Sequence, residues 1–212
     1  MLRYRMRLAC GLLLLGAVGA SLASSFALRS AIRSTSAELR SPLTPRSAAF
    51  GVWWALYALL VGRAAQTALA PRGASAPAEA ATVLLAASLL VTAAWVPVFA
   101  AWRRPLVAAV LLTVALALAL AAAVVDCART DFVDAPVAHA ASGAYAGWLL
   151  VATTLGVDIA ARARGAHGIP RAAAAAVGVV AAAAAAALPN PALGLPVAWG
   201  LALVPEMGRA EA

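Results

Sequence analysis

Long stretches without a charged residue dominate this sequence and limit what it can fold into. A helix needs about 20 mostly apolar residues to cross the roughly 30 Å hydrocarbon core of a bilayer. Six uncharged runs approach or exceed that length, namely residues 8–28, 47–62, 80–102, 105–125, 135–157 and 172–205. Only 11% of the residues are charged, against about 25% in typical soluble domains. The chain is therefore predicted to be an all-α integral membrane helical bundle.

Two of these runs need adjustment before the helices can be counted. The second run continues past Arg63 to about residue 70. The last run is too long for one crossing, and Pro189-Asn190-Pro191 is typical of a turn inside it. We predict about seven transmembrane helices in a single domain spanning 1–212, because the loops are too short for a soluble domain. The predicted helices cover about 8–28, 47–70, 80–102, 105–125, 137–160, 172–188 and 192–207.

The distribution of arginine predicts the orientation of the bundle. The net charge is +8, but the basic residues lie between apolar runs, where they orient a membrane protein rather than bind nucleic acid. One side holds Arg29, Arg33, Arg40, Arg46, Arg103, Arg104, Arg162, Arg164, Arg171 and Arg209. The other holds Arg3, Arg5, Arg7, Arg63, Arg72 and Arg129. We expect a multi-pass protein of the cell membrane, in contact with lipid, with its N-terminus outside. A cleaved signal peptide over the first run stays open as an alternative.

Aromatic residues gather on three of the predicted helices. Phe50, Trp53 and Tyr57 share one face of the second helix, because they are spaced i, i+3 and i+7. The third helix carries a stripe that includes Thr92, Trp95 and Phe99, and the fifth carries Tyr145 and Trp148. Trp102 and Trp199 fit an interfacial belt. The deeper rings are expected to face other helices, where they either pack together or line a ligand cavity.

Arg63 is the one charged residue inside a predicted span. We expect its side chain to snorkel towards the nearer interface. The alternative is an ion pair with one of the acidic residues predicted for a loop on the same side, Asp126, Asp131 or Asp134. Asp158 belongs to the opposite end of the bundle and is expected to lie beside Arg162 at the interface.

Three segments resemble the tryptophan-rich sensory proteins, the TspO / translocator protein superfamily. The stretch SPLTPRSAAFGVWWALYALL (41–60) is similar to its proline-containing loop followed by Phe-x-x-Trp-x-x-x-Tyr. The stretch LLVTAAWVPVFAAWRRP (89–105) resembles the third-helix pattern, with Thr92 in place of an asparagine. The stretch GAYAGWLLVATTLG (143–156) is similar to the fifth-helix pattern, with Gly156 in place of an asparagine.

This resemblance implies a five-helix core with two added helices, as in a longer, divergent branch of the superfamily. In that family the first loop caps a pocket for porphyrins and other flat hydrophobic ligands, and for sterols in eukaryotes. The resemblance and the aromatic pattern together predict a ligand site. Its residues are Phe50, Trp53, Tyr57, Thr92, Trp95, Phe99, Tyr145, Trp148 and Arg46. Arg46 is expected to meet ligand carboxylates such as porphyrin propionates.

The function favoured by these patterns is binding of a flat hydrophobic ligand of the tetrapyrrole, sterol or isoprenoid class, in a sensory or ligand-handling role. A small multi-pass transporter and a membrane enzyme acting on an isoprenoid or tetrapyrrole are the alternatives. We assign no catalytic residue, cofactor or metal site, because Cys10, Cys127, His139 and His167 match no metal or redox spacing. A homodimer is left open.

Overall fold

The computed structural model describes residues 2–39, 50–69, 79–166, 183, 187–188 and 190–202. Within them, seven α-helices and one 3₁₀ turn carry the fold. These are α1 (Leu2–Ala27), α2 (Arg29–Glu38), α3 (Val52–Leu69), α4 (Glu79–Ala100), α5 (Pro105–Arg129), α6 (Pro136–Arg162), η2 (Pro191–Leu193) and α8 (Gly194–Ala202). The all-α prediction is thus confirmed for the described residues.

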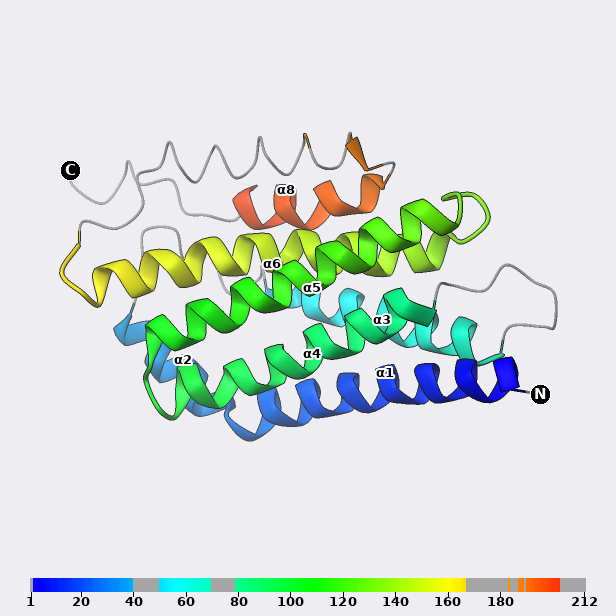
Figure 1. The fold of residues 1–212 in the computed structure, drawn as a ribbon. Coiled ribbons are helices and arrows are strands. Elements are labelled where there is room, and N and C mark those ends of the chain that lie inside the picture. Colours follow the sequence, from blue (N-terminus) through cyan, green and yellow to red (C-terminus); the bar gives the residue numbers. More distant parts are fainter. Residues whose placement is uncertain are drawn as a thin grey trace.

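Five long helices run side by side along roughly the same direction (Figure 1), and their contacts make a closed ring. In this ring α1 packs against both α3 and α4, α4 against α5, α5 against α6, and α6 closes the ring against α3. Because they follow one another in the sequence, the second and third spans, α3 and α4, are expected to be close neighbours. That expectation is wrong, because α1 lies against both of them and leaves few contacts between them.

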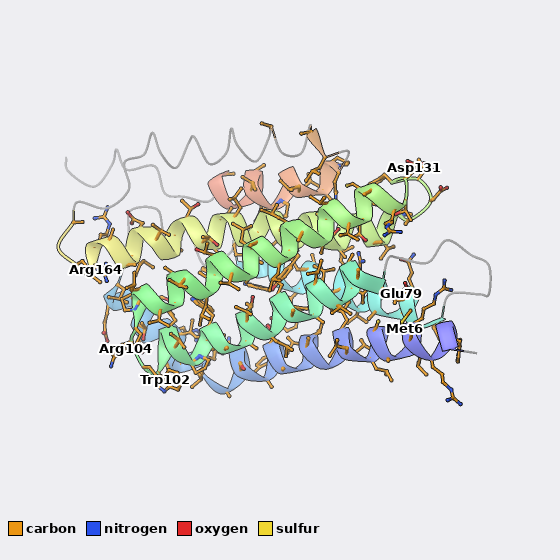
Figure 2. The ribbon with its side chains drawn as sticks, in the orientation of Figure 1. Met6, Glu79, Trp102, Arg104, Asp131 and Arg164 are labelled. Carbon is orange, nitrogen blue, oxygen red and sulfur yellow. The ribbon has the colours of Figure 1, made fainter. Side chains whose placement is uncertain are left out.

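The two ends of the bundle carry different residues. Figure 2 shows Met6, Glu79 and Asp131 at one end and Trp102, Arg104 and Arg164 at the other. We call these the Asp131 end and the Arg164 end. The split matches the two groups of loops that the arginine pattern separated, as far as the described residues extend.

Four helices are long and apolar enough to cross a membrane. They cover Tyr4–Ala27, Glu79–Ala100, Pro105–Arg129 and Pro136–Arg162, and they make the chain a multi-pass membrane protein. The helix α3, which carries Arg63, is not among the four. Most of the predicted helix 172–188 lies outside the described residues, and α8 has only 9 residues. Seven crossings therefore remain a prediction.

The helix α2 was not predicted, because residues 29–38 contain no apolar run. It lies at the Arg164 end (Figure 1), where Ala31 and Ile32 pack against a core cluster that includes Phe99, and two polar contacts add to this packing. The Thr35 hydroxyl donates a hydrogen bond to the Ala100 carbonyl over 3.3 Å, and Glu38 pairs with Arg103 over 2.8 Å. Tertiary contacts thus stabilise a helix whose own apolar content is low.

The segment η2–α8 docks on α6 through two glycines. A Cβ at Gly147 would collide with the backbone carbonyl of Leu193, and a Cβ at Gly143 would collide with the Asn190 side chain. Asn190 is fully buried and donates a hydrogen bond from Nδ2 to the His139 carbonyl over 2.8 Å. Small residues four apart on α6 therefore allow the chain after the predicted turn to approach closely.

Candidate functional site

The centre of the ring is filled by aromatic side chains of α3 and α6. Trp53 stacks on Tyr57 with ring centroids 5.4 Å apart. The same indole meets Tyr145 edge-on at 6.3 Å and Trp148 edge-on at 6.2 Å. Phe50 extends the group, with its ring 6.0 Å from that of Trp148. These five residues, called here the aromatic cluster, adopt the edge-to-face and stacked geometries that aromatic pairs prefer.

Two hydroxyl contacts tie the aromatic cluster to α4 and α1. The Tyr145 hydroxyl lies 2.8 Å from Thr92 Oγ1, which itself donates to the Ser88 carbonyl over 3.0 Å. Since a threonine hydroxyl has one proton to donate, Tyr145 is the donor to Thr92. The Tyr57 hydroxyl lies 3.0 Å from Ser21 Oγ on α1. No pattern in the sequence singles out Ser21, which is one small polar residue among several in its run.

Burial within the aromatic cluster falls from one side to the other. Tyr145 is fully buried and Trp148 is 2% exposed, whereas Trp53 is half-buried and Phe50 is 45% exposed. The Trp148 Nε1–H is buried and has no hydrogen-bond partner among the described residues. The cluster is therefore exposed at Phe50. The neighbouring Trp148 Nε1–H is a hydrogen-bond donor without a partner among the described residues.

Trp95 and Phe99 form a separate aromatic pair on α4. Their rings stack 5.2 Å apart and 15° from parallel. Because α3 and α4 share few contacts in the ring, Trp95 stacks on Phe99 of its own helix rather than on Trp53. The structure thus brings together six of the predicted site residues. Trp95 packs against the same core but stacks on Phe99, which belongs to a second core cluster. Arg46 lies outside the described residues.

Trp102 and Trp199 are 66% and 47% exposed, as expected for an interfacial belt. Trp54, the neighbour of Trp53 in sequence, is also exposed and contacts Phe26 on the outer surface. Adjacent tryptophans of α3 therefore differ sharply in environment. That difference supplies a matched control for any test of the aromatic cluster.

A second buried group surrounds Arg63, and it corrects the sequence analysis. Arg63 is fully buried and does not snorkel. Its guanidinium binds Asp126 through both terminal nitrogens, Nη1 and Nη2, over 2.6 and 2.9 Å, and also donates to the Ala138 carbonyl over 2.9 Å. Asp126 lies in the last turn of α5, because that helix continues to Arg129. The pair links α3 to α5 across the interior of the ring.

Asp158, at the other end of α6, is also fully buried. It accepts a hydrogen bond from Arg162 Nε over 2.9 Å, as expected from their spacing. Both buried aspartates among the described residues are therefore held by an arginine.

His139 is buried on α6 near the Asp126 group, and the sequence analysis gave it no role. Its Nε2 lies 3.0 Å from the Thr130 carbonyl, which can only accept, so Nε2 carries a proton. Its Nδ1 faces Cys127 Sγ at 3.7 Å. No group of three potential metal-binding side chains occurs in the described part of the chain. His139 thus fastens the α5–α6 connection to α6.

Comparison with known proteins adds one finding to this geometry. A family model described as TSPO-like protein matches residues 8–204, which includes most of α1 and all of the other helices of the ring. No curated protein and no solved structure matches the chain.

Proposed function

Because the chain belongs to the TSPO-like protein family, we propose that it binds a flat hydrophobic ligand at the aromatic cluster and has a sensory or ligand-handling role in the cell membrane. The ligand is of the tetrapyrrole, sterol or isoprenoid class. The observation that carries the proposal is the position of Trp53, whose indole contacts Tyr57, Tyr145 and Trp148 inside the ring.

The aromatic cluster has the parts that such a ligand requires. Phe50 and the half-buried Trp53 offer ring surface for stacking at the accessible edge. The free Nε1–H of Trp148 offers a hydrogen bond to a ligand oxygen or nitrogen, and making it removes the cost of a buried unpaired donor. Tyr145 and Thr92 close the floor through their own hydrogen bond. Trp95 and Phe99 belong to the proposed site at its periphery. Arg46 is proposed to meet ligand carboxylates.

The electrostatics favour binding over acid catalysis. A membrane cyclase needs a buried carboxylic acid that can give up its proton. Asp126 and Asp158, which are the buried carboxylates of the described residues, each accept hydrogen bonds from an arginine. Each carboxylate is therefore engaged in a structural ion pair, and neither belongs to the aromatic cluster.

The experiment that tests this function is mass spectrometry of the small molecules that the protein retains after purification in mild detergent. The wild type is expected to retain a flat hydrophobic compound of one of the three classes. Trp53→Leu should lose that compound, whereas Trp199→Leu, on the exposed side of α8, should keep it. Equal retention by both variants would contradict binding at the aromatic cluster.

A further inference from the structure

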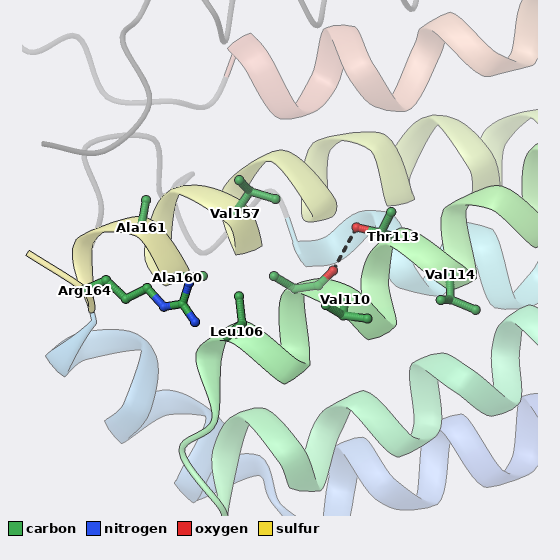
Figure 3. Close-up of a pocket in the computed structure, with 9 residues that line it drawn as sticks. Leu106, Val110, Thr113, Val114, Val157, Ala160, Ala161 and Arg164 are labelled. Carbon is green, nitrogen blue, oxygen red and sulfur yellow. Dashed lines mark hydrogen bonds between the residues drawn. The ribbon is translucent and has the colours of Figure 1, made fainter. Parts of the chain in front are cut away.

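A groove of about 400 Å³ lies on the outer face of the bundle between α5 and α6, near the Arg164 end (Figure 3). Its walls are Leu106, Val110 and Val114 of α5 and Val157 of α6, which are all exposed. None of the residues that line it belongs to the aromatic cluster. The groove is therefore a separate feature from the proposed ligand site.

Small side chains at the contact between the two helices produce the groove. Ala109 of α5 and Ala160 of α6 lie at its floor and are buried. One turn before Ala160 on α6, Gly156 allows close packing, since a Cβ there would lie 3.0 Å from the Leu112 side chain. The helices pack tightly at Gly156 and leave a gap beside Ala160 and Ala161. The lining residues of α5 run from Leu106 to Val114, about 12 Å of helix, so the groove runs along the helix axis.

Thr113 and Arg164 are the polar residues that line the groove, and only the Arg164 side chain has no partner among the described residues. The Thr113 hydroxyl donates to the Ala109 carbonyl over 2.9 Å (Figure 3). Arg164 stands at the mouth of the groove, with its guanidinium turned to the Leu106 end. It forms no ion pair with a described residue, whereas Arg162 is paired with Asp158 and Arg103 with Glu38. The groove thus ends at an uncompensated positive charge.

We propose that this groove binds one anionic glycerophospholipid of the surrounding bilayer, with an acyl chain between α5 and α6 and the phosphate on Arg164. An apolar channel that opens to the lipid phase suits an alkyl chain. The planar guanidinium can donate two parallel hydrogen bonds to phosphate oxygens. A neutral sterol would fill the channel and leave Arg164 without a counter-charge, so charge complementarity favours the phospholipid.

Native mass spectrometry with two lipids of identical acyl chains, phosphatidylglycerol and phosphatidylcholine, tests this proposal. The wild type should retain phosphatidylglycerol preferentially. Arg164→Gln should reduce that preference about fivefold, the effect of one basic residue near an anionic lipid surface. Arg33→Gln removes an exposed arginine of α2 at the same end of the bundle and should leave the preference unchanged.

A second variant tests the apolar half of the site. Ala161→Leu fills the groove and should lower retention of both lipids, whereas Ala58→Leu, at an exposed position of α3, should not. Equal loss of preference in Arg164→Gln and Arg33→Gln would show that diffuse surface charge selects the lipid and would overturn the site. Equal retention of the two lipids by the wild type, or unchanged retention by Ala161→Leu, would overturn it as well.

Discussion

Arg63 of α3 and Asp126 of α5 form a bidentate ion pair in which both side chains are buried, with N–O distances of 2.6 and 2.9 Å. The two helices are not adjacent in the ring, so the pair crosses the interior and joins opposite walls. The guanidinium also reaches the Ala138 carbonyl, which brings α6 into the same contact. One ion pair therefore fixes the relative positions of three helices near the Asp131 end.

Removing one partner of this pair should destabilise the protein strongly. Arg63→Met or Asp126→Leu leaves an uncompensated buried charge, which costs about 3–5 kcal/mol in the free energy of unfolding. The double variant should cost far less than the sum of the two, because neither charge then remains. The coupling energy is measured on the wild type, the two single variants and the double variant. Each is dissolved in a mild detergent and unfolded by adding a denaturing detergent.

The partly exposed pair Arg7–Glu79 is the control for that cycle. Its coupling energy should not exceed about 1 kcal/mol, as for other exposed pairs. A coupling for Arg63 and Asp126 as small as that of the control would contradict a buried structural ion pair.

Gly147 should be intolerant of even the smallest side chain. The methyl group of Gly147→Ala would collide with the Leu193 carbonyl and push η2 and α8 away from α6, at a cost of about 1–3 kcal/mol. Gly16→Ala on α1, where nothing lies within 4 Å, should be neutral or slightly stabilising. Thermal unfolding of both variants compares the two sites. Equal stability of Gly147→Ala and the wild type would mean that η2 does not dock on α6.

The location of the helices followed from hydropathy because a membrane span needs little beyond a long apolar run. The ends of α3, α4, α5 and α6 lie within a few residues of the predictions. The helix α2 was not predicted, because it has no long apolar run. Its residues are polar, and the bonds that hold it, from Thr35 to Ala100 and from Glu38 to Arg103, join segments far apart in sequence.

Which side chains meet across the ring was harder to predict than where each helix lies in the sequence. Three aspartates were candidates for Arg63, and the choice depended on how far α5 continues. The i, i+3, i+7 spacing placed Phe50, Trp53 and Tyr57 on one face, but it could not show which helix that face meets. The ring places it against α6, so Trp53 meets Tyr145 and Trp148 rather than Trp95.

Reporter fusions should place the two ends of the bundle on opposite sides of the membrane. The arginine distribution predicts that a fusion within 163–168 is cytoplasmic and one within 72–78 is not. In the fold, α6 ends at the Arg164 end and α4 begins at the Asp131 end, next to these two insertion regions. Activity of both reporters on one side would contradict the predicted topology.

Arg46 should discriminate between ligands by charge. Arg46→Ala is expected to weaken an anionic porphyrin about tenfold or more, which is the effect of losing one charge-assisted hydrogen bond, and to leave a neutral sterol nearly unchanged. Arg33→Ala, an exposed arginine of α2, is the control. The dissociation constants of both ligands, measured for the wild type and the two variants, test this prediction. Equal weakening of porphyrin and sterol by Arg46→Ala would leave this residue as an orientation signal alone.

The central claim is that the aromatic cluster binds a flat hydrophobic ligand, and a protoporphyrin titration of Trp53→Leu against Trp54→Leu tests it most directly. The two variants differ by one position on α3, but Trp53 faces the cluster whereas Trp54 is 64% exposed on the outer surface. Dissociation constants are measured from the porphyrin absorbance, which does not depend on the number of tryptophans. We predict that the wild type binds protoporphyrin saturably at micromolar concentration. Trp53→Leu should weaken this binding about tenfold, since stacking on one ring contributes about 1–3 kcal/mol, and Trp54→Leu should leave it unchanged. Equal weakening by the two variants, or no saturation in the wild type, would contradict the account.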